Sequence, residues 1–145
     1  MICGLGSDLV DIARIRRALE RFPERFAARV FTPGERAYCA AWADPAACLS
    51  KRFAAKEAFV KALGSGFRGG LWFTDIEVVH GPLGNPALRL APVARAALRR
   101  VRCHGPLRVH LTLSDEGGMA LAVVVLEGSP PRKQHRRRRT GSMRS

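Results

Sequence analysis

The order of apolar and polar positions predicts a strand, then a run of helices, then a second group of strands. The apolar segment from Ile2 to Leu9 is typical of a strand that ends at Asp8. Asp11 is expected to cap a helix, because apolar residues then recur at helical spacing at Ile12, Ile15, Leu19 and Phe22. Pro23 and the pair Thr32-Pro33 predict the starts of two further short helices.

The segment from Pro45 to Leu63 predicts the longest helix, because it is rich in Ala, Lys, Leu and Glu and is followed by Gly64. A glycine-rich loop over 64–70 comes next. Strands are expected over 73–80, 87–90, 107–113 and 119–126, with a short basic helix over 93–101, and the last two strands form a hairpin. This order predicts an α+β domain whose antiparallel sheet packs against the long helix.

The charge is unevenly distributed along the 145 residues, whose net charge is +13. Residues 128–145 hold seven Lys or Arg and no acid, and they are poor in apolar residues. We therefore expect a folded domain over 1–127 and a disordered, Arg-rich tail over 128–145. The domain keeps 18 basic and 12 acidic residues, a net charge of +6. That moderate charge favours phosphate-rich ligands or acidic protein partners without identifying either.

The chain has no segment that predicts membrane insertion or export. The longest apolar run, Met119 to Leu126, is too short to cross a bilayer, and Asp8 and Asp11 interrupt the N-terminal apolar stretch. The spacing of the four cysteines, at positions 3, 39, 48 and 103, suggests neither a zinc site nor a disulfide framework. We expect unpaired, mostly buried thiols in a cytoplasmic protein.

Charged residues on the long helix form the first candidate site. Phe53, Glu57 and Lys61 are four residues apart and share one face. On the helix alone, an ordinary solvated Glu–Lys pair is the favoured interpretation. Asp8 is either a turn residue or one of two carboxylates that converge on Mg²⁺, which takes a few protein oxygens and keeps positions for water and phosphate. The loop Gly64-Ser65-Gly66 could cradle a phosphate, although such loops are common.

The combination of these segments resembles the holo-acyl-carrier-protein synthases, the short bacterial type of 4′-phosphopantetheinyl transferase. The resemblance runs from about Ile2 to Glu127. It is carried by Gly4-Leu5-Gly6-Ser7-Asp8-Leu9-Val10-Asp11-Ile12, Arg52-Phe53-Ala54-Ala55-Lys56-Glu57-Ala58, Lys61-Ala62-Leu63-Gly64-Ser65-Gly66 and Asp75-Ile76-Glu77-Val78.

The resemblance implies a 4′-phosphopantetheinyl transferase-like fold and an Mg²⁺-dependent transfer of phosphopantetheine from coenzyme A to a serine of an acyl carrier protein. Adenosine 3′,5′-bisphosphate would be released, and fatty acid or polyketide biosynthesis would be served. Asp8 and Glu57 would hold the metal, and Glu57 and Lys61 would be catalytic. The implied coenzyme A-binding residues are Arg52, Lys61, Gly64, Ser65 and Gly66.

The proton acceptor for the serine is left open among Glu57, Glu35 and a metal-bound water. The implied assembly is a homotrimer with shared sites, in which the hairpin over 107–126 contributes to the interface. One departure stands out: Ser114 is followed by Asp115, where some family members have a histidine. The nearest histidine, His110, is therefore only a minor candidate.

A basic stripe on the first predicted helix is the candidate docking surface for the acidic carrier protein, formed by Arg14, Arg17 and Arg21. An ordinary solvated face is the alternative. The main rival function is nucleic-acid binding, which the run Arg136 to Arg139 supports and the absence of a recognised DNA- or RNA-reading motif opposes. An inactive trimeric homologue is a second rival, and the retained candidate site residues argue against it.

Overall fold

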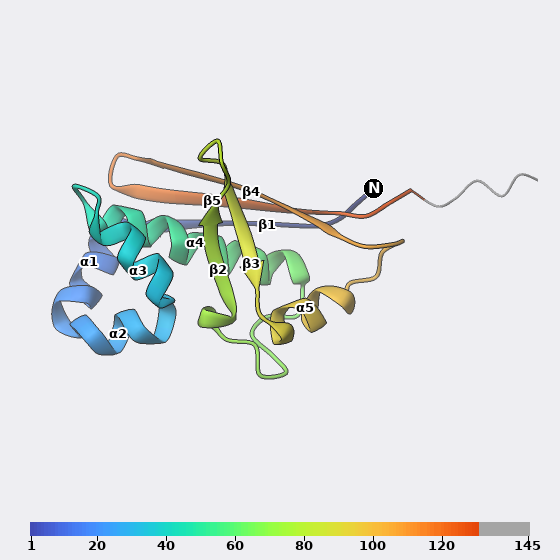
Figure 1. Ribbon diagram of the computed structural model, residues 1–145, viewed down its shortest axis with the longest axis horizontal. Coiled ribbons are helices and arrows are strands. Elements are labelled where there is room, and N and C mark those ends of the chain that lie inside the picture. The colour runs from blue at the N-terminus through green and yellow to red at the C-terminus, as the bar shows by residue number, and fades with distance from the viewer. Residues whose placement is uncertain (131–145) are drawn as a thin grey trace, which may run out of the picture.

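The computed structural model describes residues 1–130, which form a three-stranded sheet, a two-stranded ribbon and one long helix between them (Figure 1). Three short helices gather at one end of the long helix, and a fifth helix lies at the other end. In chain order the elements are β1 (Ile2–Asp11), α1 (Ile12–Arg21), α2 (Pro23–Val30), α3 (Pro33–Ala40), α4 (Pro45–Leu63), the 3₁₀ helix η1 (Phe73–Asp75), β2 (Ile76–His80), β3 (Pro86–Leu90), α5 (Pro92–Arg99), β4 (Arg108–Glu116) and β5 (Met119–Glu127).

The larger sheet has the order β1-β5-β4, and both pairings are antiparallel. Alternate residues of the central strand β5 point to opposite faces of the sheet, as the pleat requires. The fully buried set belongs to the core that also contains one side of α4, and it comprises Ala120, Ala122, Val124 and Leu126. The α+β prediction, with an antiparallel sheet packed against a long helix, is confirmed; β2 and β3 form a separate ribbon.

Two glycines let β1 lie directly against α4. A Cβ atom on Gly6 would collide with the carbonyl oxygen of Ala58, and one on Gly4 would collide with that of Ala62. Because glycine has no Cβ, the strand backbone can approach the helix this closely. The contact holds β1 beside the last turns of α4. The expectation that this strand ends at Asp8 is wrong, because β1 continues to Asp11.

Local signals set the starts and ends of the helices. The Asp11 carboxylate accepts a hydrogen bond from the Ala13 amide at 3.0 Å, and Thr32 and Glu35 form a capping box. Gly64 ends α4 with a φ of +76°. The expectation of a strand over 73–80 is wrong for residues 73–75, which form a 3₁₀ helix. The Asp75 carboxylate accepts a hydrogen bond from the Trp72 amide at 2.8 Å and helps to close it.

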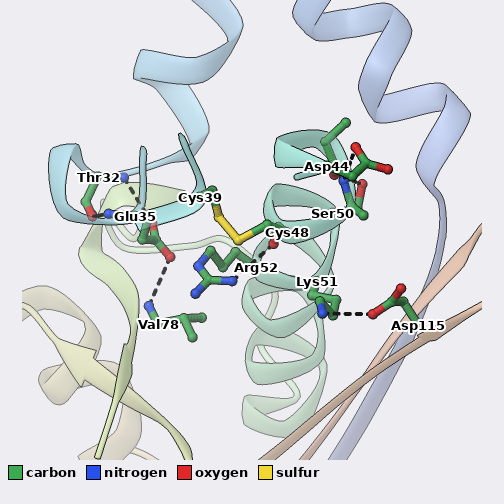
Figure 2. Close-up of a disulfide and its surroundings, with 12 residues drawn as sticks. Thr32, Glu35, Cys39, Asp44, Cys48, Ser50, Lys51, Arg52, Val78 and Asp115 are labelled. Carbon is green, nitrogen blue, oxygen red and sulfur yellow. Dashed lines mark hydrogen bonds and ion pairs between the residues drawn. A yellow bond between two sulfur atoms is a disulfide. The ribbon is translucent and has the colours of Figure 1, made fainter. Parts of the chain in front are cut away.

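The four cysteines form two disulfides, so the expectation of unpaired thiols is wrong. Cys39 and Cys48 join the end of α3 to the first turns of α4, with Cα atoms 5.4 Å apart (Figure 2). Cys3 and Cys103 join β1 to the segment after α5, with Cα atoms 5.8 Å apart. Residues 3 and 103 are 100 positions apart, so it is the tertiary fold that brings them together, and sequence spacing could not predict the pair.

The two ends of the described chain are hydrogen-bonded to each other. The Gly128 amide donates to the Met1 carbonyl at 2.8 Å, and the N-terminal amine donates to the Gly128 carbonyl at 3.0 Å. Most of the predicted tail, residues 131–145, lies outside the described residues, so its disorder stays a prediction. Within residues 1–130, no helix combines the length and the hydropathy needed to cross a membrane.

Candidate functional site

Asp8 and Lys61 meet where β1 crosses the last turns of α4. The Lys61 ammonium lies 3.0 Å from Asp8 Oδ1 and donates to the Ser7 carbonyl at 3.0 Å. The Asp8 side chain is mostly covered, whereas that of Lys61 is about half exposed. The ordinary helix pair expected from the sequence is not what forms in the described chain, because Lys61 makes its ion pair with Asp8 rather than with Glu57.

Glu57 is the second carboxylate of this group. Burial raises the pKa of Glu57, and the negative charge of Asp8 raises it further, while Lys61 and Arg14 act in the opposite direction. The structure thus brings two like charges from β1 and α4 close enough to disfavour ionisation of one of them. A cation bound between the two carboxylates would relieve this repulsion.

The glycine-rich loop follows directly from Lys61. Gly64 and Gly66 have φ angles of +76° and +70°, which L side chains rarely adopt, and Ser65 between them is exposed. The Gly64 amide donates to the Lys61 carbonyl at 3.1 Å, so the loop begins at the helix end without a spacer. These residues form an exposed segment at the end of α4, the helix that carries Glu57 and Lys61.

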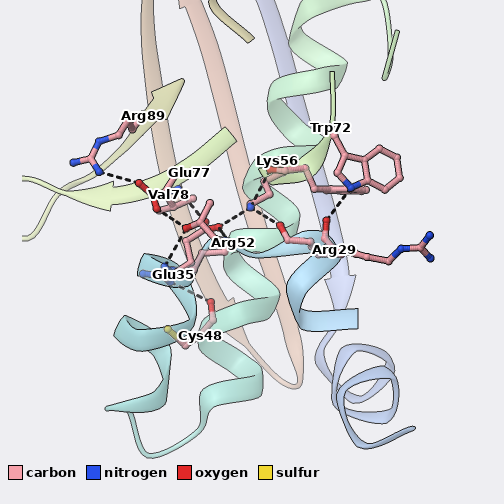
Figure 3. A network of polar contacts seen from close by, with 12 residues as sticks. Arg29, Glu35, Cys48, Arg52, Lys56, Trp72, Glu77, Val78 and Arg89 are labelled. Atoms are coloured by element: carbon pink, nitrogen blue, oxygen red, sulfur yellow. Dashed lines mark hydrogen bonds and ion pairs between the residues drawn. The ribbon is translucent and has the colours of Figure 1, made fainter. Parts of the chain in front are cut away.

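Glu35, one of the three candidate proton acceptors, is buried in a structural network (Figure 3). Its carboxylate lies 2.6 Å from the Lys56 ammonium and accepts from the amides of Thr32 and Val78, each at 3.0 Å. With its oxygens already paired and its side chain 1% exposed, Glu35 is not placed to take a proton from a substrate. Glu57 or a water molecule is left for that role.

Arg52 does not lie with Asp8 and Lys61. It precedes Lys61 by nine residues on α4, which corresponds to about 13 Å of helix rise and a half-turn of rotation. Its guanidinium lies over the ring of Tyr38, 4.5 Å from the ring centre, and donates to the Cys48 carbonyl at 3.1 Å. Among the described residues, its Nε and Nη2 atoms are buried without a hydrogen-bond partner.

Arg52 lines an open pocket of about 420 Å³ beside the start of α4, which we call the α3–α4 pocket. Its lining mixes small and apolar residues with charged and aromatic ones, among them Tyr38, Trp42, Lys51, Arg52, His80 and Asp115. His80 stacks on Tyr38 with ring centres 4.6 Å apart. Burial and the charges of Arg52 and Lys51 lower the pKa of His80, which leaves the ring neutral at pH 7.

The sequence analysis did not single out Tyr38, Lys51 or His80. The adjacent Lys51-Arg52 pair was the signal that could have pointed to this pocket, but helix periodicity alone does not show which side chains α3 and β2 bring to it. His110 lies elsewhere: its Nε2 is 3.6 Å from the Glu127 carboxylate, and its side chain is half exposed.

The basic stripe on α1 faces solvent. Arg14, Arg17 and Arg21 are all exposed, as the helical spacing predicted, and the Arg21 guanidinium lies 5.2 Å from the centre of the Phe22 ring. Arg14 is also near enough to Glu57 for its charge to lower the pKa of that carboxyl. The stripe therefore adjoins the carboxylate pair.

Comparison with known proteins agrees with the fold and with the motifs. The sequence profile of the 4′-phosphopantetheinyl transferase superfamily matches residues 4–124. A holo-acyl-carrier-protein synthase of Methylobacterium sp. (strain 4-46) is 52% identical over 128 residues, which are 88% of this chain and 95% of the relative.

Solved structures give the same result. The holo-acyl-carrier-protein synthase of Neisseria meningitidis superposes with a TM-score of 0.78 at 41% identity, covering 88% of this chain and 99% of that one. The Helicobacter pylori enzyme, solved in complex with coenzyme A, gives a TM-score of 0.72 at 30% identity, covering 85% and 99%. The chain belongs to the 4′-phosphopantetheinyl transferase superfamily, among the holo-acyl-carrier-protein synthases.

Proposed function

We propose that this chain transfers the 4′-phosphopantetheine group of coenzyme A to a serine of an acyl carrier protein, at the site where Asp8, Glu57 and Lys61 converge. Adenosine 3′,5′-bisphosphate is the second product. The observation that carries this proposal is the approach of two carboxylates, from β1 and α4, beside a lysine on a helix that ends in a glycine-rich loop. The domain responsible is the folded part, residues 1–127.

The carboxylate pair suits Mg²⁺. No set of three or more His, Cys, Asp or Glu side chains in residues 1–130 is arranged to enclose a metal ion. Two carboxylates that leave further positions to water and phosphate oxygens are the donor set that Mg²⁺ accepts. Asp8 and Glu57 would hold the ion, which would supply positive charge for the diphosphate of coenzyme A.

The protein groups around this pair have separate tasks. Lys61 would place an ammonium near the phosphate oxygens on which charge develops. The amides of Gly64, Ser65 and Gly66 would hold phosphate oxygens, because backbone without bulky side chains can come close to them. Glu57 or a bound water would accept the proton of the attacking serine.

Arg52 supports a site that is shared between subunits. It remains a proposed coenzyme A-binding residue, since its buried, unpartnered N–H groups suit phosphate oxygens. Arg52 and Lys61 lie on opposite sides of α4, so one coenzyme A molecule would have to pass around the helix to reach both in one subunit. A neighbouring subunit that brings its Asp8 and Lys61 to this pocket removes the difficulty.

The open face of the larger sheet offers the surface for that neighbour. Leu5 and Leu9 of β1 are 65% and 62% exposed, and Leu121, which lies opposite Leu9 on β5, is 38% exposed. Water-exposed leucines in adjacent strands are typical of an interface. We propose that three copies cover these faces mutually, with the hairpin of β4 and β5 contributing to the contact.

The α1 stripe is the proposed docking surface for the carrier protein. Its arginines are exposed and Arg14 adjoins the carboxylate pair, so an acidic partner bound there would have its serine near the site.

A direct assay tests the proposal. The purified chain is incubated with apo acyl carrier protein, coenzyme A and Mg²⁺, and the carrier is weighed by intact-protein mass spectrometry. We expect the added mass of one phosphopantetheine group, and none on a carrier whose acceptor serine is replaced by alanine. Truncation after Glu127 should leave the reaction intact, whereas a protein that acts through its Arg-rich tail would lose its function.

A further inference from the structure

One ion pair on the wall of the α3–α4 pocket has no part in the function proposed above. The Lys51 ammonium lies 2.8 Å from Asp115 Oδ1, across the gap between α4 and the hairpin of β4 and β5 (Figure 2). The two side chains are 29% and 39% exposed, so the pair lies at the mouth of the pocket rather than in the core.

Two carboxylates line the pocket, and Asp115 is the one that pairs with a lysine of the lining, Lys51. The other carboxylate of the lining, Asp44, is held by the guanidinium of Arg16 in two parallel hydrogen bonds of 3.0 and 3.1 Å, and it also caps α4. Arg52 lies deeper, with two unpartnered N–H groups among the described residues. On this wall Lys51 is thus held by Asp115, whereas Arg52 is 2% exposed and its unpartnered N–H groups are buried behind the surface.

We infer that Asp115 is an affinity-setting residue that competes with phosphate groups of the nucleotide for Lys51. This inference rests on the proposed binding of coenzyme A in the α3–α4 pocket. An incoming phosphate takes over Lys51 and displaces the carboxylate, and Asp115 re-forms the pair when the nucleotide leaves. The competition weakens the binding of adenosine 3′,5′-bisphosphate and favours its release after the transfer.

The size of the effect follows from the exposure of the pair. Partly exposed ion pairs contribute up to about 1 kcal/mol, so removal of the competing charge should tighten nucleotide binding by roughly two- to fivefold. The gain should shrink at high salt, because both the pair and the incoming phosphate are screened.

The test uses calorimetric titration of the full chain with adenosine 3′,5′-bisphosphate at low salt. The variant Asp115→Asn removes the charge and keeps the shape, and Asp115→Glu restores the charge. Glu116→Gln is the matched control, because it changes the net charge equally at the exposed neighbouring position. Lys51→Met, alone and combined with Asp115→Asn, completes a double-mutant cycle.

We expect tighter binding for Asp115→Asn, near-normal binding for Asp115→Glu and Glu116→Gln, and weaker binding for Lys51→Met. The gain from Asp115→Asn should largely vanish when Lys51 is already replaced. Equal effects of Asp115→Asn and Glu116→Gln would overturn the inference, and so would a gain that persists in full without Lys51, since that would be simple charge repulsion.

The same titrations separate this inference from the function on which it rests. If Lys51→Met weakens binding while Asp115→Asn has no effect, the pocket takes the nucleotide and only the competition is wrong. If neither variant changes binding, the assignment of the pocket to coenzyme A fails as well, and transfer activity would have to be explained without it.

Discussion

The Lys56 ammonium and the Glu35 carboxylate lie 2.6 Å apart, and neither side chain is exposed to solvent. Lys56 also donates to the carbonyl of Val30 at 2.6 Å and to that of Phe73 at 3.1 Å. One buried ammonium thus ties α4 to the end of α2, to α3 and to η1 (Figure 3). Burial lowers the pKa of Lys56, and the charge of Glu35 counteracts that shift.

Replacement of Lys56 by methionine should strongly destabilise the fold. It would leave the Glu35 charge buried and unpaired, which typically costs about 3–5 kcal/mol. The measurement is the free energy of unfolding in urea. Lys51→Met is the control, since it breaks a partly exposed pair and should cost less than about 1 kcal/mol. The double variant Lys56→Met/Glu35→Leu should recover much of the loss; equal stability of Lys56→Met and the parent would contradict the assigned role.

Replacement of Asp8 or Glu57 by alanine should remove most transferase activity and leave the fold intact. Loss of a metal-holding carboxylate forfeits several kcal/mol of charge stabilisation, so turnover should fall by at least about 100-fold. The measurement is carrier-protein modification at limiting Mg²⁺, with circular dichroism as the check on folding. Glu116→Gln, an exposed carboxylate of the hairpin, should retain activity. Near-normal turnover in either variant would remove that residue from the proposed site.

The carboxylate pair should also reduce stability when no metal is bound. Because the pKa of Glu57 is raised in the folded state, the native protein binds that proton more tightly than the unfolded chain does. Stability is therefore lost as the pH rises above the ordinary glutamate pKa, about 4.3. Glu57→Gln should unfold at a higher temperature than the parent at pH 7, and the advantage should disappear below pH 4.

Thermal unfolding with and without Mg²⁺ tests whether a bound ion relieves the repulsion between Asp8 and Glu57. Added Mg²⁺ should stabilise the parent and have little effect on Glu57→Gln, because an ion stabilises only the state that binds it. A Glu57→Gln variant that is less stable than the parent at pH 7 without metal would show that burial and the charge of Asp8 do not outweigh the attraction of Lys61 and Arg14.

Charge reversal at Arg14 and Arg21 should impair use of the carrier protein far more than use of coenzyme A. Single exposed pairs contribute below about 1 kcal/mol, but several together steer the encounter, and this effect is screened by salt. The double variant should show a raised KM for the carrier protein at low salt, a smaller salt dependence and a nearly unchanged KM for coenzyme A.

The control for this docking test is charge reversal at Arg99 and Arg102, which are exposed at and just after α5, at the other end of the molecule. It changes the net charge equally and should leave both KM values nearly unchanged. A raised KM for coenzyme A in the α1 variant would assign these arginines to the nucleotide site instead.

A charge on the open sheet face should prevent trimer formation. Leu9→Lys places an ammonium among exposed leucines that the proposed interface buries, so the variant should sediment and scatter light as a smaller species. Leu83→Lys is the control, because Leu83 is 95% exposed in the turn between β2 and β3 and belongs to neither β1 nor β5. A parent chain that is monomeric and fully active at assay concentration would exclude the shared site.

The parts of the fold that could be predicted from the sequence depend on local signals. Asp11 accepts a hydrogen bond from an amide two residues on, and Gly64 ends α4 by its own backbone conformation. Both are therefore visible in a few consecutive residues. Phe73 and Thr74 suit a strand, but the Asp75 amide donates to the Trp72 carbonyl at 3.1 Å and the Asp75 carboxylate accepts from the Trp72 amide, which together close a 3₁₀ helix.

The same distinction between local signals and tertiary packing applies to the residues of the candidate site. The sequence could identify three candidate site residues, Asp8, Glu57 and Lys61. They lie in motifs of recognisable order, together with the glycines that allow β1 to approach α4. Arg52 could be named, but its place could not: it depends on packing against Tyr38, which comes from another helix. The Cys3–Cys103 disulfide and the Lys51–Asp115 pair join distant segments, and spacing carries no information about them. Cys39 and Cys48 are nine residues apart, and their pairing depends on how the chain turns between α3 and α4.

The position of β1 in the sheet has a consequence for how the protein is made. Among the described strands β1 is synthesised before all others, and its hydrogen-bonded neighbour β5 is synthesised after them. During translation β1 has no strand to pair with until nearly the whole domain has emerged, and such distant pairings form slowly. Until that final strand is added, only the packing of Gly4 and Gly6 against α4 holds Asp8 beside Lys61. A ribosome-bound fragment that lacks β5 should therefore be inactive, however much of its helical part has already folded.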